Sequence, residues 1–203
     1  SIVVASSLPD ASTTGDACTA NVNFPPAAIS DNCASNSQIT VKIVIAGQTI
    51  YTNGGLITNI PQGNHMAIYT ASDGCGNTSS DTSLITVKDN IGPVAICKSA
   101  KTIQLGQAGM LTMPASAFDD GSFDLCYPFT TVKVRRLPWS SFCGLTDSSI
   151  NRFDDLVKFC CEDANKDIMV IVRVYQGLIQ PGPISLDAYG VYTDCMVMVK
   201  VLD

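Results

Sequence analysis

Residues 83–98 read SLITVKDNIGPVAICK, and this stretch decides the fold. Ile85 and Val87 alternate with Thr86 and Lys88, a pattern typical of a strand with one buried face. The run at 89–93, Asp-Asn-Ile-Gly-Pro, ends the strand, because Gly and Pro interrupt a ladder and Asn and Asp favour turns. A second strand then begins at Val94. The stretch therefore predicts a joint between two β modules.

The same strand ending returns at the C-terminus, where residues 195–203 read CMVMVKVLD. When the two strand endings are aligned, Ile85, Val87 and Asp89 match Val199, Val201 and Asp203. This repeat predicts two modules in tandem, residues 1–91 with an N-terminal lead-in and residues 92–203. The chain starts at Ser1 without a signal peptide, so we expect a mature or excised piece of a longer protein.

Composition indicates an all-β chain. Of 203 residues, 46% are hydrophobic and 15% are charged, which excludes a disordered chain. Val, Ile, Thr and Ser abound, and long amphipathic helical patterns are missing. About seven short strands per module, with turns at regular spacing, predict two tandem immunoglobulin-like β-sandwiches.

Three local patterns are specific enough to test. Residues 38–46 alternate, which predicts a strand with Ile39, Val41, Ile43 and Ile45 on one face. Residues 167–175 predict a second strand, with Ile168, Val170, Val172 and Val174 facing in and Arg173 facing out. Residues 101–105 and 110–113 flank Gly106–Gly109, a hairpin-like pattern.

Charge and cysteine usage narrow the class of protein. The formal net charge of −6 argues against a nucleic-acid partner, whose phosphates need a basic face. No stretch of about 20 apolar residues exists, so we expect no membrane span in this segment. The nine cysteines are widely spaced apart from Cys160 and Cys161, unlike the paired cysteines of zinc sites. They favour disulfides formed in an oxidising compartment.

Catalysis has little support in the sequence. The single histidine, His65, lies on an expected strand among apolar neighbours, which favours a packed or surface role over a catalytic one. No phosphate-binding Gly-rich loop and no His-Glu-x-x-His motif is present. We expect a non-enzyme without a cofactor.

Two motif sets carry a family resemblance. Residues 18–25 (CTANVNFP), 30–33 (SDNC) and 69–78 (YTASDGCGNT) resemble the hyalin repeat (HYR), an immunoglobulin-like module of extracellular proteins. Residues 93–98 (PVAICK), 117–126 (AFDDGSFDLC), 159–163 (FCCED) and 195–197 (CMV) look like a relative. Such repeats occur in very large surface proteins and gliding adhesins of Bacteroidetes-type bacteria. The resemblance implies a secreted, extracellular or cell-surface bacterial protein.

The resemblance also implies a bridge from the closing strand to the first strand of a module. Cys195 shares the parity of the inward-facing Val197 and Val199, and Cys97 is its natural partner. In the first module the alignment puts Asp81 at the position of Cys195. Cys18 is therefore expected to be unpaired within its module, either as a buried thiol or bonded to another chain or module.

The remaining cysteines are expected to pair. By the same resemblance, Cys33 pairs with Cys75, joining two turns. Cys126, Cys143, Cys160 and Cys161 form two further bridges. Neighbours on a strand point to opposite faces, so Cys160 and Cys161 should face opposite ways, one toward the core, and only their mutual pairing is discounted.

Two weaker candidate sites remain. Asp119, Asp120 and Asp124, and Asp89 at the joint, could hold calcium, but side chains capping local backbone N–H groups are the preferred explanation, because the Asp-x-Asp-x-Asp spacing of a calcium loop is missing. Arg135, Arg136 and Trp139, together with Phe142, could form a binding patch, but packing of Trp139 in the core or at an edge is preferred, because an aromatic side chain buries a large area on folding.

Two functions follow as hypotheses. The first is a structural segment of an extracellular fibre or adhesin, whose partners are further repeats of the same polypeptide or copies in a homo-oligomeric fibre. The second is a module that binds a surface glycan or protein through the loops after Leu137 and Gly177, where the second module has an insertion at 177–189. Because aromatic residues are only 7% of the chain and scattered, the first hypothesis is preferred.

Overall fold

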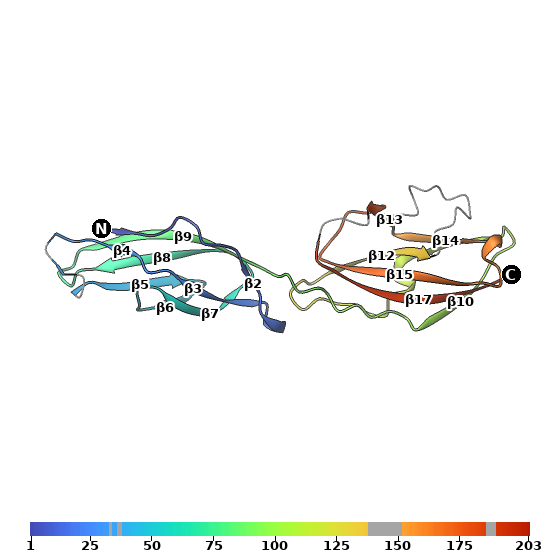
Figure 1. Ribbon diagram of the computed structural model, residues 1–203, viewed down its shortest axis with the longest axis horizontal. Helices are drawn as coiled ribbons and strands as arrows, with labels where there is room; N and C mark the ends of the chain where they lie inside the picture. Colours follow the sequence, from blue (N-terminus) through green and yellow to red (C-terminus); the bar gives the residue numbers. More distant parts are fainter. Residues whose placement is uncertain (33, 36–37, 138–151, 186–189) are drawn as a thin grey trace. The chain divides into compact units, whose positions relative to one another are not determined.

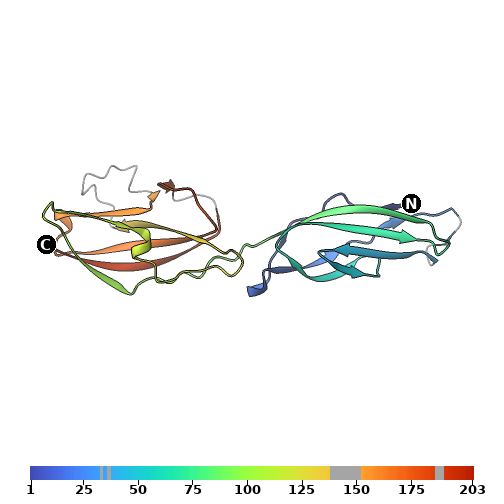
Figure 2. The same cartoon turned by 180° about the vertical axis from the view of Figure 1, so that it is seen from behind.

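The computed structural model describes residues 1–32, 34–35, 38–137, 152–185 and 190–203. The chain divides into two compact units, Ser1–Ile91 and Gly92–Asp203 (Figures 1 and 2). This is the same boundary that the Asp-Asn-Ile-Gly-Pro break predicts. Within the described residues the only helices are short 3-10 turns, and none is long and apolar enough to cross a membrane.

The first unit contains nine described strands in three sheets. A five-stranded sheet has the order β2-β9-β8-β5-β6, and β3-β7 and β1-β4 form two-stranded sheets. The strands are β1 (Ile2–Val3), β2 (Ala11–Ser12), β3 (Thr19–Phe24), β4 (Ala28–Ile29), β5 (Thr40–Ile45), β6 (Gln48–Ile50), β7 (Gly55–Pro61), β8 (Gly63–Ser72) and β9 (Thr78–Lys88).

The core of the first unit lies between the five-stranded sheet and the β3-β7 pair. Alternation places every second side chain of β5, β8 and β9 in this core. As the sequence predicts, Val41, Ile43 and Ile45 are buried on one face of β5. The whole buried apolar cluster comprises Ile2, Ala20, Val22, Phe24, Ala27, Val41, Ile43, Ile45, Ile57, Ile60, Ala67, Tyr69, Ala71, Ile85 and Val87.

The second unit repeats this layout with a four-stranded sheet, order β10-β17-β15-β12, and the pairs β11-β14 and β13-β16. Its strands are β10 (Ala100–Gln104), β11 (Met110–Pro114), β12 (Thr130–Leu137), β13 (Arg152–Phe153), β14 (Leu156–Cys160), β15 (Asp167–Gln176), β16 (Ile184–Ser185) and β17 (Tyr192–Leu202). The four residues of β15 expected to face inward, Ile168, Val170, Val172 and Val174, are all buried, and the first three belong to the apolar core of the unit. All-β architecture and two tandem immunoglobulin-like sandwiches are therefore correct.

Each unit closes in the same way: the first strand of its largest sheet runs parallel to the last strand of that sheet. In the first unit Ala11 of β2 lies opposite Val87 of β9. In the second unit Ile103 of β10 lies opposite Val201 of β17. Val87 and Val201 are the positions that the sequence repeat superimposes, so the repeat extends to strand pairing.

The predicted hairpin around Gly106–Gly109 is wrong. β10 pairs with β17, whereas β11 pairs with β14 in the other layer of the sandwich. The backbone N–H of Gly109 donates to the carbonyl of Gly106 at 2.7 Å, forming a tight turn. This turn carries the chain from one sheet to the other, which local sequence cannot distinguish from a hairpin.

Candidate functional site

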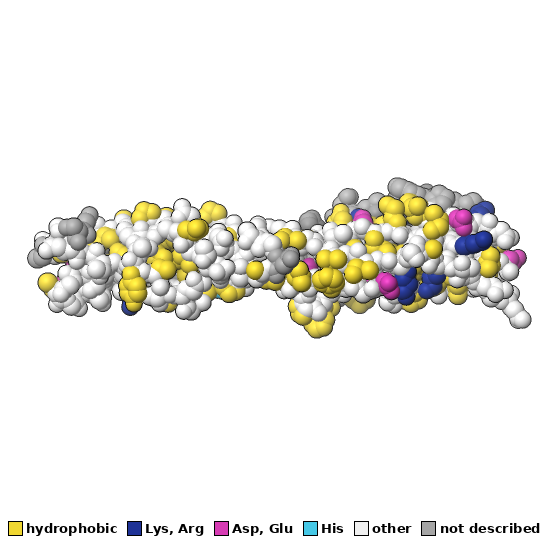
Figure 3. Space-filling view, turned by 90° about the horizontal axis from the view of Figure 1, so that it is seen from below, with side chains coloured by type: hydrophobic (Ala, Val, Ile, Leu, Met, Phe, Trp, Pro, Cys, Tyr) yellow, Lys and Arg dark blue, Asp and Glu magenta, His cyan; other side chains and the backbone are white. Residues whose placement is uncertain are grey.

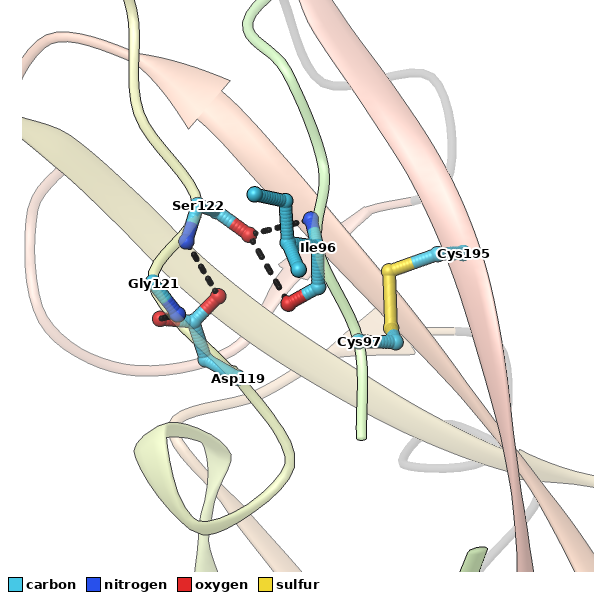
Figure 4. Close-up of a disulfide and its surroundings, with 6 residues drawn as sticks. All are labelled: Ile96, Cys97, Asp119, Gly121, Ser122 and Cys195. Atoms are coloured by element: carbon cyan, nitrogen blue, oxygen red, sulfur yellow. Dashed lines mark hydrogen bonds between the residues drawn. A yellow bond between two sulfur atoms is a disulfide. The ribbon is translucent and has the colours of Figure 1, made fainter. Parts of the chain in front are cut away.

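A disulfide between Cys97 and Cys195 ties the start of the second unit to its last strand (Figure 4). The two Cα atoms lie 6.0 Å apart, within the range that a disulfide spans. This is the pair that the resemblance implies. A cross-link between residues 98 positions apart restricts the unfolded chain strongly, so the bridge stabilises the closed unit.

The Asp-rich turn that contains Asp119 and Asp120 holds the segment beside this disulfide. Ser122 Oγ accepts a hydrogen bond from the backbone N–H of Ile96 at 2.8 Å (Figure 4). The Asp119 carboxylate in turn accepts the backbone N–H groups of Gly121 and Ser122, each at 3.2 Å. The turn therefore positions the strand segment that carries Cys97.

The calcium candidates behave as acceptors for protein donors. Asp124 Oδ1 accepts the backbone N–H groups of Cys126 at 2.8 Å and of Tyr127 at 2.9 Å. The backbone N–H of Asp120 donates to the Ile96 carbonyl at 2.8 Å. These contacts satisfy local donors, as the alternative interpretation of an Asp-rich turn expects.

Asp89, the calcium candidate at the joint, is buried and also engaged. Its Oδ1 accepts the Thr13 hydroxyl at 2.8 Å and the backbone N–H of Ile91 at 3.0 Å. Thr13 follows β2, so Asp89 fastens the end of β9 to the lead-in segment. Calcium binding at these aspartates stays a prediction, and the observed hydrogen bonding does not require it.

The expectation that Cys18 is unpaired is wrong, because Cys18 is disulfide-bonded. Cys126 and Cys160 are disulfide-bonded as well. Cys18 follows a 3-10 turn and has a left-handed backbone, with φ of 55°, one residue before β3 begins. The expectation rested on Asp81 standing at the position of Cys195, which removes only one possible partner of Cys18.

Among the described residues, Cys75 and Cys161 carry free, exposed thiols. Because the Cys75 thiol is free, the predicted Cys33–Cys75 bridge is wrong. Cys33 itself lies outside the described residues. The prediction that Cys161 forms one of the two further disulfides of the second module is also wrong. Its thiol donates to the Gly109 carbonyl at 3.3 Å, while the adjacent Cys160 is buried. The two neighbours thus face opposite ways, as expected, whereas Cys143 lies outside the described residues.

The structure does not bring Arg135 and Arg136 together in the binding patch that was suggested with Trp139. Arg136 is buried and makes a two-pronged ion pair with the Asp163 carboxylate, one of whose contacts is 2.8 Å. Arg135 lies on the opposite face of β12, with its guanidinium 5.4 Å from the Phe153 ring centre. Adjacent residues on a strand cannot share a face. Trp139 lies outside the described residues.

A charged cluster on the outer face of the four-stranded sheet was not predicted. The Arg173 guanidinium lies between two rings, 4.1 Å from the Phe153 centre and 3.7 Å from the Tyr192 centre. It donates to both Asp194 carboxylate oxygens, at 2.7 and 2.8 Å. Burial lowers the pKa of Arg173, and the hydrogen bonds to Asp194 more than offset this, so the net direction is upward. Burial and the neighbouring Arg173 lower the pKa of Arg135.

The register could have indicated this cluster, because Arg173 and Asp194 lie directly opposite one another on β15 and β17. Opposite charges at such positions attract. Sequence alone places Arg173 on the outer face but does not show that the side chain is buried there against Phe153 and Tyr192. It also does not show which residue of β17 Arg173 faces.

The insertion after Gly177 is fixed to the unit's own sheet by Lys133. This side chain is fully buried, and its Nζ donates to Asp155 at 2.6 Å and to the carbonyls of Gln180 and Gly182 at 3.1 and 2.8 Å. Burial raises the pKa of Asp155, whereas hydrogen bonds from Lys133 and Gly182 lower it, with a net lowering. The described part of the insertion is thus anchored to its own unit, and its role as a contact loop stays a prediction.

His65 has no acid–base partner among the described residues. Its Nε2 lies 2.6 Å from the Pro61 carbonyl oxygen. This local contact spans the short connection between β7 and β8, and it gives His65 neither a nucleophile nor a carboxylate. The ion pairs of the second unit, Lys133–Asp155, Arg136–Asp163 and Arg173–Asp194, are likewise internal.

Comparison with protein-family models gives no match for the chain, and comparison with curated proteins gives none either. Several solved structures are similar in fold. The EC1-2 segment of human mucin-like protocadherin is 11% identical with a TM-score of 0.47, covering 100% of this chain and 98% of that one. The I67-I69 fragment of titin is 10% identical with a TM-score of 0.48, covering 96% and 62%. The Ig1-2 module of the Drosophila receptor protein tyrosine phosphatase DLAR is 9% identical with a TM-score of 0.29, covering 100% and 98%. Similarities this weak carry no functional inference.

Proposed function

We propose that the chain is a structural repeat segment of a large extracellular fibre or adhesin. In this role its disulfide-stapled modules act as spacers and mediate assembly and surface attachment. The observation that carries the proposal is the repeated closure of each unit, in which the first strand of the largest sheet runs parallel to the last strand of that sheet. A chain whose two modules close in the same way is suited to extension by further copies of that module.

The use of polar groups supports a structural role. Each buried cation of the second unit is neutralised by an aspartate of the same unit, and the described part of the Gly177 insertion is anchored to Lys133. A ligand site would instead present unfilled donors and aromatic rings in a pocket. We therefore place the role in spacing and assembly, with no enzymatic step and no cofactor.

The disulfides support an extracellular location, because such bonds persist in oxidising compartments. A bacterial cell surface is the location implied by the resemblance to HYR-type repeats. Further repeats of the same polypeptide and copies in a fibre are the partners we propose. A surface glycan or protein is the target of attachment.

Electron microscopy of the native, full-length material tests the proposal. We expect fibres or extended arrays of regularly spaced beads, each the size of one sandwich unit. A denaturing gel with and without reductant then separates covalent from non-covalent assembly. Isolated, compact particles without extended arrays would contradict the assembly role.

A further inference from the structure

The outer face of the largest sheet of the first unit carries an exposed apolar patch. Alternate side chains of a strand share one face, and residues opposite one another on neighbouring strands lie side by side. Met66 of β8 lies opposite Leu84 of β9. Ile68, two residues along β8, lies opposite Val44 of β5. Met66, Ile68 and Leu84 are 59%, 41% and 45% exposed, and with the half-buried Val44 they form what we call the first outer patch.

The second unit carries an apolar patch at the equivalent place. The sequence repeat matches Leu84 with Met198. Met169 of β15 lies opposite Met198, as Met66 lies opposite the equivalent residue in the first unit. Met196 lies two residues before Met198 on the same face of β17, and the two side chains are 58% and 40% exposed. We call Met169, Met196 and Met198 the second outer patch.

Methionine is concentrated in these two patches. Four of the six methionines of the chain belong to them, Met66, Met169, Met196 and Met198. The flexible thioether side chain of methionine adapts to apolar surfaces of varied shape. A site for a polar ligand such as a glycan would instead bring fixed polar groups and rings together in a pocket. The patches therefore favour an apolar protein surface as their occupant.

Charge leaves this face of the first unit open to a copy of itself. The unit has six Asp against two Lys, a formal charge of −4, so two copies repel one another over most of their surface. On the outer face of β5, β8 and β9 the only charged side chains are Lys42 and Lys88, and Lys88 pairs with Asp10. On the side shown in Figure 3, the first unit has hydrophobic and uncharged surface almost throughout.

The charged residues beside the second outer patch are matched in sign across the strands. Arg173 lies opposite Asp194 at one end of the patch, and Asp167 lies opposite Lys200 at the other. Opposite charges at such positions attract, so little unbalanced charge borders the patch. A copy of the same unit is therefore not repelled at this face.

One outer patch alone is too small to hold a stable complex. With about 200 Å² of accessible surface for a fully exposed Met, Ile or Leu, the exposed fractions amount to about 300 Å² in the first unit and about 200 Å² in the second. A stable interface buries about 800 Å² on each partner. A firmly bound occupant must therefore engage several patches at once, which requires a repetitive partner. A second copy of this chain, which carries the same patches in the same order, meets this requirement.

We propose that the outer patches are the surface through which two copies of this chain associate side by side, patch against patch. This inference rests on the proposed function and deepens it, because it names the surface that assembly uses. Each patch contact is weak by itself, so association strengthens with the number of modules that two copies align.

Sedimentation velocity of the intact chain tests the inference. We expect the weight-average mass to rise from 21.4 kDa toward twice that value as the concentration approaches about 1 mM, because small apolar contacts give weak affinity. The variants Met66→Lys/Leu84→Lys and Met196→Lys/Met198→Lys each place charge in one patch. Each should weaken association at least about tenfold. A wild type that stays at 21.4 kDa over the whole range would overturn the inference.

Matched controls separate the patches from a general effect of added charge. Leu56 of β7 and Met110 of β11 are more than half exposed and lie in the other sheet layer of their units. Leu56→Lys and Met110→Lys should leave association within about twofold of the wild type. Equal weakening by the control variants and the patch variants would overturn the inference.

Photochemical cross-linking tests the contact without any charge change. The chain is produced with photo-methionine, a diazirine analogue, and copies labelled with heavy nitrogen are mixed with unlabelled ones. Peptide pairs of mixed isotope then report links between copies, and we expect them from Met66, Met196 and Met198 and not from Met110. Links between copies that come chiefly from Met110 would overturn the inference. Links from the patches of native material to a different protein would do the same.

Failure of this inference is distinguishable from failure of the proposed function. Fibres in the native material, together with unchanged association of the patch variants, would overturn the inference and leave the assembly role standing. Native material without extended arrays contradicts the assembly role itself.

Discussion

The backbone N–H of Val4 donates a hydrogen bond to Asp81 Oδ2 at 2.8 Å, in the place where the second unit has its disulfide. Leu84 bridges Ser7 in parallel, and Asp81 and Val4 each lie three residues earlier. In the second unit Val199 lies opposite Lys101, and Cys195 and Cys97 each lie four residues earlier. The repeat puts Asp81 on Cys195 and Leu84 on Met198. A hydrogen bond and a disulfide therefore fasten the same two segments.

This equivalence predicts that a disulfide can replace the hydrogen bond. The double variant Val4→Cys/Asp81→Cys should oxidise spontaneously and raise the melting temperature of the first unit. A loop of 77 residues limits the gain to about 4 kcal/mol in the chain-entropy model. Non-reducing peptide mapping identifies the linked peptides, and reduction should abolish the gain. Two free thiols at these positions after oxidation would show that the registers of the two units differ.

The same carboxylate should make the first unit sensitive to acid. Hydrogen bonds from the N–H groups of Val4 and Thr82 hold the pKa of Asp81 below its ordinary value of 3.8. A lowered folded-state pKa stabilises the protein above the unfolded-state value and loses this effect as the pH falls through the folded-state value. In thermal melts, wild type should lose more stability than Asp81→Asn between pH 5 and pH 2. Parallel curves over that range would contradict the assignment.

How far the sequence predicts the fold depends on whether a feature is local. Strand alternation is local, so the inward faces of Asp167–Tyr175 and of residues 38–46 agree with the structure. Sheet membership is not local, which is why Lys101–Met113 resembled a hairpin although its two strands lie in different sheets. The repeat of Val87 and Val201 was the only sequence signal for strand pairing between distant segments.

The site was less predictable than the fold, because side-chain partners depend on register. Arg136 was assigned to a binding patch, since nothing local shows that Asp163, which follows β14, neutralises it. Cys97 and Cys195 could be matched because the family resemblance implies a bridge between the first and the closing strand, and Cys195 shares the parity of the inward-facing Val197 and Val199. Cys18 lies just outside a strand, so the repeat gave no direction for its side chain.

Removing Arg136 should strongly destabilise the second unit. Asp163 is almost fully buried, and Arg136→Met leaves its charge without a cation. Breaking one side of such a pair costs about 3–5 kcal/mol. The double variant Arg136→Met/Asp163→Leu should lose less than Arg136→Met alone, although it also leaves the Cys160 N–H without its acceptor. Calorimetry of the intact chain measures both, and equal losses would contradict a charge-based explanation.

Thiol labelling checks the cysteine assignments. Iodoacetamide added to the native, unreduced chain should alkylate Cys75 and Cys161, whose thiols are exposed, and leave Cys97 and Cys195 linked. Mass spectrometry of the peptides shows which cysteines carry the label. A peptide linking Cys75 to Cys33 would restore the pairing that the resemblance implies and contradict the free thiol.

Lys133 should hold the insertion after Gly177 against the sheet. Its Nζ is the shared donor to the carbonyls of Gln180 and Gly182 and to Asp155, and Met at this position fills similar space without donating. Leaving these acceptors without their donor should cost about 1–3 kcal/mol and free the segment 177–185. Limited proteolysis with thermolysin should then cut near Leu178, which is 80% exposed, several times faster than in wild type. Lys42→Met is the matched control. Lys42 also lies within a sheet strand, paired with Thr70 on β8 as Lys133 is paired with Arg173 on β15, but the Lys42 side chain is exposed. Equal cleavage of the Lys133→Met variant and wild type would mean that packing other than this ammonium group holds the insertion in place.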